Sequence, residues 1–149
     1  MAHTLGVEQP KVAILSAVET IQPKLRSTLD AAALCKMADR GQIKGGLLDG
    51  PLAMDNAINL EAARIKKIDS PVAGSADILL APDLEAGNIL AKQLIFLAGS
   101  EAAGIMLGAR VPIILTSRAD SMRTRRASAA IATLHAYAQI QAPRKGTGR

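Results

Sequence analysis

Short apolar runs alternate with segments of helical pattern along almost the whole of this 149-residue chain. The runs that resemble strands are apolar throughout instead of alternating with polar residues, which indicates that both faces of a sheet are covered. They are Lys11–Ser16, a very short stretch within Gly45–Pro51, Asp77–Ala81, Ala102–Leu107 and Val111–Leu115. This pattern predicts an α/β fold with a mostly parallel sheet and helices on both of its faces.

Four helical segments are expected between and after these strands. Ser27–Asp30 resembles a capping box with Asp in place of Glu, which predicts a helix from Ser27 to about Arg40. A second helix is expected within Asp55–Lys67, with Asn59 as a possible later start, and a third after Pro82–Asn88. The apolar face of this third helix is Leu90, Leu94 and Leu97, with Ile89 and Phe96 beside them. The last helix is expected to begin near Asp120 or Ser121 and to bury Ala127, Ile131, Leu134 and Ala138.

The chain has one Phe, one Tyr and no Trp, so its core is expected to consist of Ala, Leu, Ile and Val. The scarcity of aromatic side chains also argues against a base-stacking surface for single-stranded nucleic acid. The single Cys35 cannot form an internal disulfide and is interpreted as a small core residue in a reducing compartment. No apolar segment approaches the roughly 18 residues of a membrane span, so we expect a cytoplasmic protein that does not bind a membrane.

The net charge of +5 is concentrated at the end of the chain. Residues 1–117 carry a net charge of −1, whereas residues 118–149 carry seven basic side chains and only Asp120 as an acid. Arg123, Arg125 and Arg126 at the start of the last helix are interpreted as a solvated face, in preference to a site for nucleic acid or CoA phosphates. Residues 141–149 are expected to form a disordered basic tail.

The most specific candidate site lies in Val111–Ser121, where a short apolar run ends in Thr116, Ser117 and Arg118 directly before a helix. A guanidinium, two hydroxyls and the free N–H groups of a helix start can together hold an anion such as phosphate. The alternative is a capped helix start with a solvated arginine, because Asp120 and Ser121 are both good N-caps.

Two other polar turns follow predicted strands. Asp83, Glu85 and Asn88 could serve a metal or acid–base chemistry, although carboxylates complementing a helix N-terminus are the preferred interpretation. The same alternatives apply to Asp49, Gly50–Pro51 and Asp55, and Gly–Pro by itself indicates only a turn. His3 is expected near a frayed end and His135 is expected to be structural. The chain lacks a P-loop, a GxGxxG fingerprint, paired Cys/His metal spacing and a nucleophile elbow, which excludes several classes of enzyme.

Taken together, these segments resemble the phosphate acetyl/butyryltransferase family, and within it the branch fused to enoyl-CoA hydratase-like domains. The resemblance runs in the family's order from Leu5 to about Ala138. The segments that carry it are Lys11–Glu19, Ser27–Gly41, Asp49–Ala57, Ser70–Gly74, Asp77–Asn88 and Thr116–Ser121. It implies a fold of the isocitrate/isopropylmalate dehydrogenase type, with the site in the cleft between two α/β domains.

The resemblance implies transfer of an acyl group between CoA and inorganic phosphate, with acyl-CoA and phosphate as partners and CoA as a substrate or product. It implies no metal and no cofactor. Ser117 and Arg118 match the family's catalytic Ser–Arg pair. Residues expected to contribute to substrate binding are Thr116, Asp83, Gly87, Asn88, Gly50 and Pro51. In acetyl-specific relatives an Asp lies seven positions after the Ser, but Thr124 stands there in this chain, so no general base can be assigned.

Family members are roughly twice as long as this chain. Residues 1–140 are therefore expected to be the C-terminal portion of the catalytic region, incomplete relative to the full fold and impaired in activity by itself. The alternative is a non-catalytic half-enzyme or oligomerisation module that needs a partner chain, the missing N-terminal half or a second copy. Nucleic-acid binding and a dehydrogenase of the same fold are further alternatives, but neither has a supporting motif.

Overall fold

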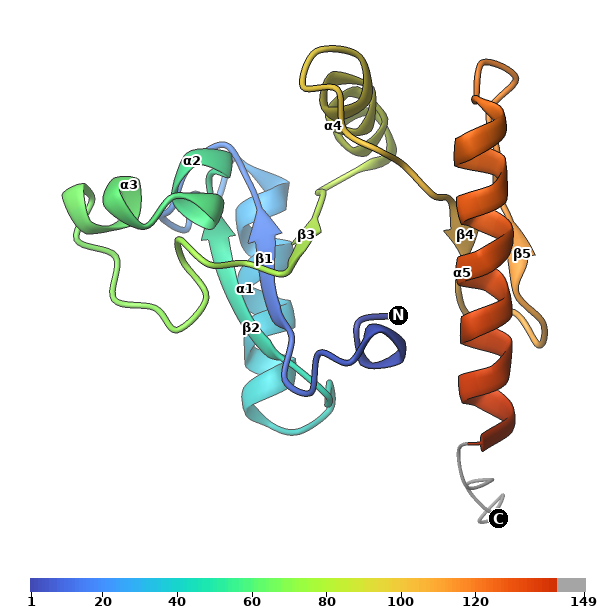
Figure 1. Ribbon diagram of the computed structural model, residues 1–149. Helices are drawn as coiled ribbons and strands as arrows, with labels where there is room; N and C mark the ends of the chain where they lie inside the picture. The colour runs from blue at the N-terminus through green and yellow to red at the C-terminus, as the bar shows by residue number, and fades with distance from the viewer. Residues whose placement is uncertain (142–149) are drawn as a thin grey trace. The chain divides into compact units, whose positions relative to one another are not determined.

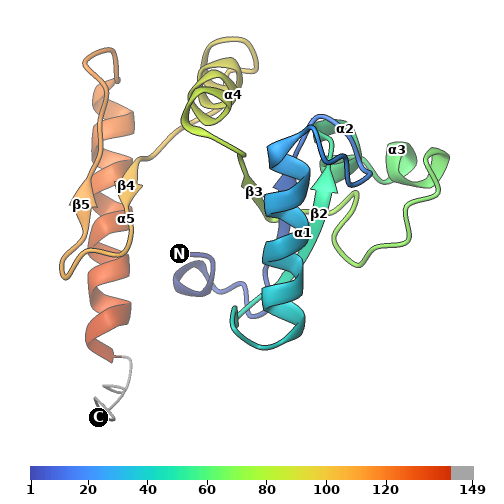
Figure 2. The ribbon, with the colours of Figure 1, turned by 180° about the vertical axis from the view of Figure 1, so that it is seen from behind.

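The computed structural model describes residues 1–141, and it divides them into two compact units. One unit comprises residues 2–91, and the other comprises residues 92–141 together with Met1. The boundary falls within the helix α4, Leu84–Phe96. Figures 1 and 2 show the elements of both units in order along the chain. The disordered tail expected at residues 141–149 lies, apart from Gln141, outside the described residues.

The first unit is built on a parallel sheet of three strands in the order β2-β1-β3. Its strands are β1 at Lys11–Leu15, β2 at Leu47–Leu52 and β3 at Ile78–Leu80. Lys11 pairs with Leu47 on one side of the central strand, and Val12 pairs with Ile78 on the other. The sequence therefore predicted these three strands correctly, including their parallel arrangement.

Helices and a connecting segment cover this sheet. The helix α1, Arg26–Asp39, lies along one face, as both views show (Figures 1 and 2). Because side chains alternate along a strand, Ile14 points to the opposite face from Ala13 and Leu15. Ala13 and Leu15 belong to a buried cluster with Leu52, Ala57, Ala63, Val72 and Ala73. This cluster draws on the short helices α2, Met54–Ile58, and α3, Leu60–Ile65. The core is aliphatic, as the composition predicted.

Two helix starts differ in how well the sequence predicted them. Asn59 accepts hydrogen bonds from the N–H groups of Glu61 and Ala62, so it caps α3 and separates it from α2. The capping box at Ser27 was wrong, because α1 begins one residue earlier and Leu25 precedes it without a side-chain cap. The Ser27 hydroxyl instead lies 2.8 Å from that of Ser16, just beyond β1, so a tertiary contact uses the group that the local pattern assigned to the cap.

The second unit contains an antiparallel strand pair and the long helix α5, Met122–Gln141. The strands are β4 at Ile105–Met106 and β5 at Ile113–Ile114, with Ile105 paired to Ile114. These strands form their own two-stranded sheet, so the prediction of a mostly parallel sheet is wrong for this part of the chain. Only six residues connect them, which is too short for the crossover that parallel strands require.

The buried face of α5 is displaced from the predicted stripe. Ser128 and Ala132 are buried, whereas Leu134 is half exposed. The Ser128 hydroxyl accepts a hydrogen bond from the N–H of Gly104 at 3.0 Å and donates one to the carbonyl of Thr124 at 2.8 Å. A small polar residue thus fixes α5 against the strand β4, which a search for apolar periodicity does not detect.

Many large apolar side chains of the described residues are exposed. No residue of α4 is buried, and Phe96 and Leu97 at its end are 65% and 83% exposed. The predicted apolar face of this helix therefore exists but is mostly uncovered. Ile113, Ile114 and Leu115 around β5 are also exposed. Apolar exposure on this scale is typical of surfaces that other protein covers.

Candidate functional site

The segment Thr116–Arg118 follows β5 directly, and backbone contacts fix its beginning. The N–H of Leu115 donates to the carbonyl of Gly104 at 2.9 Å. A Cβ atom at Gly104 would lie 2.3 Å from the carbonyl oxygen of Leu115, so only glycine permits this approach. Gly104 therefore connects three features: the start of the predicted anion site, the strand β4 and the buried Ser128 hydroxyl.

Ser117 and Asp120 form a turn before α5. The Ser117 N–H donates to the Asp120 carboxylate at 2.6 Å, and the Asp120 N–H donates to the Ser117 carbonyl at 3.1 Å. The Ser117 hydroxyl accepts the N–H of Ala119 at 3.3 Å and keeps its own proton for donation. Ser121 caps the helix, because its hydroxyl accepts the N–H of Thr124 at 3.1 Å. Of the two candidate N-caps, Ser121 is the one that caps α5, whereas the Asp120 carboxylate accepts the N–H of Ser117.

Arg118 and Thr116 are exposed. Within residues 1–141 the Arg118 guanidinium has neither an ion pair nor a hydrogen bond, so its donors are not paired with a carboxylate of these residues. An unpaired guanidinium one residue after a hydroxyl that can still donate is compatible with anion binding.

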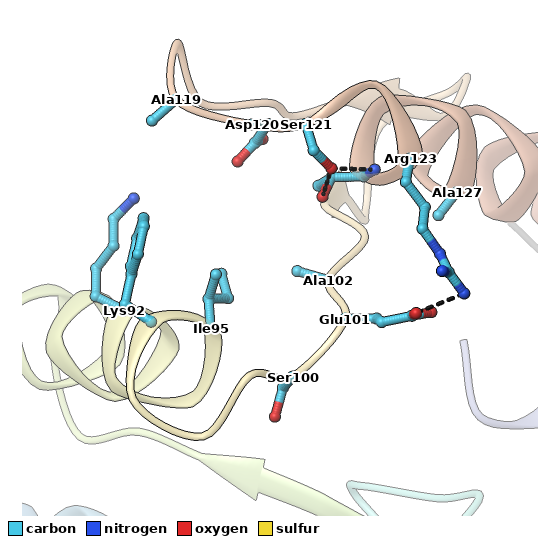
Figure 3. A pocket seen from close by; sticks show the side chains of 12 residues that line it. Lys92, Ile95, Ser100, Glu101, Ala102, Ala119, Asp120, Ser121, Arg123 and Ala127 are labelled. Atoms are coloured by element: carbon cyan, nitrogen blue, oxygen red, sulfur yellow. Dashed lines mark hydrogen bonds and ion pairs between the residues drawn. The ribbon is translucent and has the colours of Figure 1, made fainter.

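A cavity of about 360 Å³ lies beside this turn, entirely within the unit of residues 92–141, and Figure 3 shows it from close by. We call it the α5 cavity. Its polar lining is Lys92, Ser100, Glu101, Asp120, Ser121, Arg123 and Thr124. Its apolar lining is Ile95, Phe96, Ala102, Ala119 and Ala127. Thr116, Ser117 and Arg118 border this lining in sequence without being part of it. Thr124 lies within it, with its hydroxyl 3.0 Å from that of Ser121.

The predicted site residues around Asp83 have structural roles in the described chain. The Asp83 carboxylate accepts the N–H of Ala86 at 2.7 Å, and its carbonyl accepts the N–H of Gly87. Asp83 therefore caps α4, as the preferred interpretation held. Asn88 is exposed and lines a hollow of about 340 Å³ with Leu84, Glu85 and Ile89. No group of His, Cys, Asp and Glu within residues 1–141 is arranged to hold a metal ion.

Gly50 and Pro51 belong to β2, with Pro51 buried and a cis peptide bond between them. A Cβ atom at Gly50 would lie 2.7 Å from the carbonyl oxygen of Ile14, so this glycine allows β1 and β2 to approach. Because β1, β2 and β3 are parallel, their carboxyl ends share one edge of the sheet, which brings Gly50–Pro51 and Asp83 to the same edge. Ligands of open α/β sheets bind at this edge.

The two histidines have structural contacts. The His3 ring lies 2.7 Å from the Gly45 carbonyl, which corrects the expectation of a frayed end, and His135 contacts Gln139.

The sequence analysis did not predict an ionic cluster at the same edge, although it named one of its members, Asp55, as a candidate residue. Lys66, after α3, pairs with Glu19, in the loop after β1, and with Asp55 in α2 at 3.0 Å. The fully buried Asn56 donates its amide N–H to Glu19, while its own side-chain oxygen has no hydrogen-bond partner in the described part of the chain, residues 1–141. The residues of this cluster come from three segments separated by up to 47 residues, so no local sequence motif predicts that they pair.

The cluster predicts a pH-dependent stability. Hydrogen bonding to Lys66 holds the pKa of Glu19 below its usual 4.5 and that of Asp55 below its usual 3.8, and the same contacts raise the pKa of Lys66 above 10.5. Depressed carboxyl pKa values stabilise the fold above the usual values, and this contribution is lost as the pH falls from the usual values through the lowered ones. The raised lysine pKa stabilises the fold below pH 10.5, and this contribution is lost as the pH rises from 10.5 through the raised value.

We therefore expect Lys66→Met to lower the free energy of unfolding at neutral pH by the modest amount typical of exposed ion pairs. The difference from the wild type should shrink as the pH falls below 4.5. Urea unfolding at a series of pH values measures this, with Lys24→Met, an exposed lysine, as the control. A difference that stays constant into acid would contradict the assignment of the ion pairs.

Cys35 is expected to be unreactive at neutral pH. Burial, assisted by the negative charges of Asp49 and Asp39, raises the pKa of its thiol from 9.0 to about 11. At pH 8 its thiolate fraction, and thus its alkylation by iodoacetamide, should be roughly a hundredfold below that of a thiol with the usual pKa. The rate measured against a free-thiol standard should rise up to a pH of about 11. Rapid alkylation at pH 7 would refute this.

The geometry defines the class of protein: an α/β protein with a serine and an arginine in the turn before a helix, the arginine without a partner among residues 1–141, beside a cavity of mixed polarity. The family model described as "Phosphate acetyl/butaryl transferase" matches residues 1–133, and the chain belongs to this family. The predicted family is thereby confirmed, as is the α/β fold class. The finer assignment to the branch fused to enoyl-CoA hydratase-like domains stays a prediction.

Three relatives illustrate the similarity. Phosphate acetyltransferase of Rhizobium meliloti is 69% identical over 132 residues, which cover 89% of this chain and 42% of that protein. Phosphate butyryltransferase of Clostridium acetobutylicum is 53% identical, over 90% of this chain and 44% of that protein. The crystal structure of a branched-chain phosphotransacylase from Enterococcus faecalis is 34% identical with a TM-score of 0.80, over 91% of this chain and 49% of that one. The chain thus spans less than half the length of these relatives.

Among the helices of the described residues, none has both the length and the hydropathy that a membrane-spanning helix needs.

Proposed function

We propose that this chain is the C-terminal half of a phosphate acyltransferase that converts an acyl-CoA and inorganic phosphate into an acyl phosphate and CoA. The observation that carries the proposal is Arg118, which has no partner among the described residues, next to Ser117 at the turn before α5, in a chain of this family. The names of the relatives, phosphate acetyltransferase and phosphate butyryltransferase, support the same reaction.

In this reaction a phosphate oxygen attacks the thioester carbonyl, a C–O bond forms, and the C–S bond breaks to release CoA. Negative charge develops on the carbonyl oxygen, where a guanidinium and a hydroxyl donor stabilise it. Arg118 supplies the positive charge, and Ser117 supplies the hydroxyl proton that its contact with Ala119 leaves free. Phosphate is itself the nucleophile, so the serine need not form a covalent intermediate, and orienting two anionic reactants is much of the task.

The other predicted residues have supporting places in this proposal. Thr116 leads into the Ser117–Arg118 pair, Gly50–Pro51 and Asp83 lie at the carboxyl edge of the parallel sheet, and Gly87 and Asn88 follow in α4; we assign these residues to substrate binding. CoA acts as substrate and product, and no cofactor or metal is required. A reaction of CoA thioesters with inorganic phosphate belongs in the cytoplasm, where we place the protein. No nucleic acid and no membrane takes part.

The chain by itself is expected to have weak or no activity. It matches less than half of each curated relative, and the apolar side chains at the end of α4 and around β5 lie exposed. The same observations favour a second candidate, a non-catalytic half-enzyme that requires a partner chain or a second copy. Size-exclusion chromatography on dilution tests the second copy, since a stable monomer would exclude it.

A turnover assay tests the function. The chain is fused to the portion of the Rhizobium meliloti enzyme that it does not match, and CoA release from acetyl-CoA or butyryl-CoA is followed in the presence of phosphate. We expect the chimera to turn over and the 149-residue chain to be weak or inactive. A chimera that folds but uses neither thioester would overturn the proposed reaction. Robust turnover by the chain by itself would overturn the half-enzyme interpretation.

A further inference from the structure

The lining of the α5 cavity includes an arginine that the proposed reaction does not use. Arg123, in the first turn of α5, pairs with Glu101, and the two charged groups are 2.5 Å apart. Both residues line the cavity, and their side chains are 79% and 70% exposed. Figure 3 shows this pair on one side of the cavity and Lys92 on the other. The guanidinium thus lies at the cavity with a carboxylate of the same chain as its counter-ion.

An exposed pair of this kind is weak, because water screens both charges and two long side chains must be held in one geometry. A phosphate group carries more negative charge than a carboxylate and presents three acceptor oxygens, to which a guanidinium binds in a bidentate manner. Phosphate can therefore replace the Glu101 carboxylate at small energetic cost.

The surroundings of the pair favour such a ligand. The Ser121 and Thr124 hydroxyls line the same cavity from the start of α5, where the helix dipole is positive. The carboxylate of Asp120, the other acid in the lining, already accepts the Ser117 N–H. Ile95 and Phe96 provide an apolar wall that a carbon-containing ligand can contact.

We propose that Arg123 forms a phosphate-binding subsite in the α5 cavity and that Glu101 is its intramolecular competitor, displaced when the ligand binds. This inference rests on the proposed function, because both substrates of that reaction carry phosphate groups. It assigns Arg123 to ligand binding, whereas the sequence analysis interpreted this residue as part of a solvated face. The phosphate comes either from inorganic phosphate or from CoA, and the experiment separates these sources.

The test is calorimetric titration of the 149-residue chain at constant ionic strength with inorganic phosphate, CoA and 3′-dephospho-CoA. Glu101→Gln removes the competitor and should tighten binding about two- to fivefold. Arg123→Gln removes a charged donor and should weaken binding about tenfold or more. Arg126→Gln removes an equal charge from the same helix outside the cavity lining and should leave the dissociation constant unchanged.

The pattern over the three probes identifies the ligand. If the dissociation constant of inorganic phosphate changes in the Glu101→Gln and Arg123→Gln variants, the subsite binds the acyl acceptor. If only the dissociation constant of CoA changes, the subsite binds the coenzyme. In the second case, loss of the response with 3′-dephospho-CoA identifies the 3′-phosphate, and its persistence identifies the pyrophosphate. Each of these results supports the proposal.

Three results overturn it: no probe binds, Arg123→Gln leaves every dissociation constant within twofold, or Arg126→Gln weakens binding as much as Arg123→Gln. The last would show that net charge and not a site attracts the anion. These outcomes are separate from a failure of the proposed function, which is measured as turnover by the chimera. A subsite that responds as expected in a protein whose chimera has no turnover would remain an anion site without that reaction.

Discussion

Arg118→Ala in the chimera should lower kcat/KM for the acyl-CoA by about 10²–10³, which is the loss seen when one donor to a developing oxyanion is removed. The arginine has no internal ion pair within residues 1–141, so its loss leaves no buried carboxylate unpaired and should not disturb folding. The rate measured as CoA release therefore reports on the reaction and not on stability.

Two further variants sharpen this test. Arg118→Lys keeps the charge but cannot make the bidentate contact, so its rate should lie between those of the wild type and Arg118→Ala. Arg126→Ala, an exposed arginine on α5, should keep the wild-type rate. If Arg118→Ala is as fast as the wild type, Arg118 has no part in the mechanism.

Gly74→Ala should cause the largest loss of stability of any single methyl addition considered, about 2–5 kcal/mol. Gly74 has φ +78°, a conformation that side chains disfavour, and its N–H donates to the carbonyl of the buried Asn56. A Cβ atom there would lie 2.5 Å from the Cα of Leu60. Backbone cannot turn aside as a flexible side chain can, so α3 or the segment containing Val72 must move. Urea unfolding of the 149-residue chain measures the loss.

Two glycines separate the causes of this effect. Gly6 also has a positive φ, +86°, but no atom lies within 4 Å of its added Cβ, so Gly6→Ala should cost only about 1–2 kcal/mol of backbone strain. Gly50→Ala adds a Cβ 2.7 Å from the Ile14 carbonyl at a residue without positive φ and reports on crowding by itself. If Gly74→Ala costs no more than Gly6→Ala, the contact with Leu60 is not restrictive.

Local sequence was sufficient for most elements of the first unit. The apolar runs at Lys11–Ser16 and Asp77–Ala81 became β1 and β3 within one or two residues, and Asn59 became the predicted cap of α3. Such features depend on hydrophobic runs and on side chains that bond their own neighbours, both of which are properties of adjacent residues.

The errors have two causes. Ser27 bonds to Ser16 instead of capping α1, and the face of α5 is centred on Ser128 because this hydroxyl meets Gly104. The direction of β4 relative to β5 depends on the length of their connection, which apolar content does not encode. The errors at Ser27 and Ser128 arise where a partner distant in the sequence competes with the local pattern, whereas the error at β4 and β5 arises from a short connection.

Some residues of the candidate site could likewise be recognised from the sequence, whereas other contacts could not. Ser117 and Arg118 were recognisable because the motif is contiguous and its family resemblance is confirmed. Asp83 was correctly expected to complement the start of a helix. The Glu19–Lys66 pair and the pairing of Arg123 with Glu101 could not be predicted, since each depends on how separate segments fold together.

By itself, the sequence of this protein determined the order of its strands and helices, its aliphatic core and the residues that stand at the turn before the last helix, because these follow from side-chain chemistry within a few positions. The tertiary structure alone decided which of those groups are already used. In the folded chain Asp120 accepts a hydrogen bond from Ser117, Lys66 pairs with Glu19, and Glu101 pairs with Arg123. The Arg118 guanidinium has no partner within residues 1–141. The physical reason is that hydrogen bonds and ion pairs act over a few ångströms of space, and only folding brings distant residues within that range.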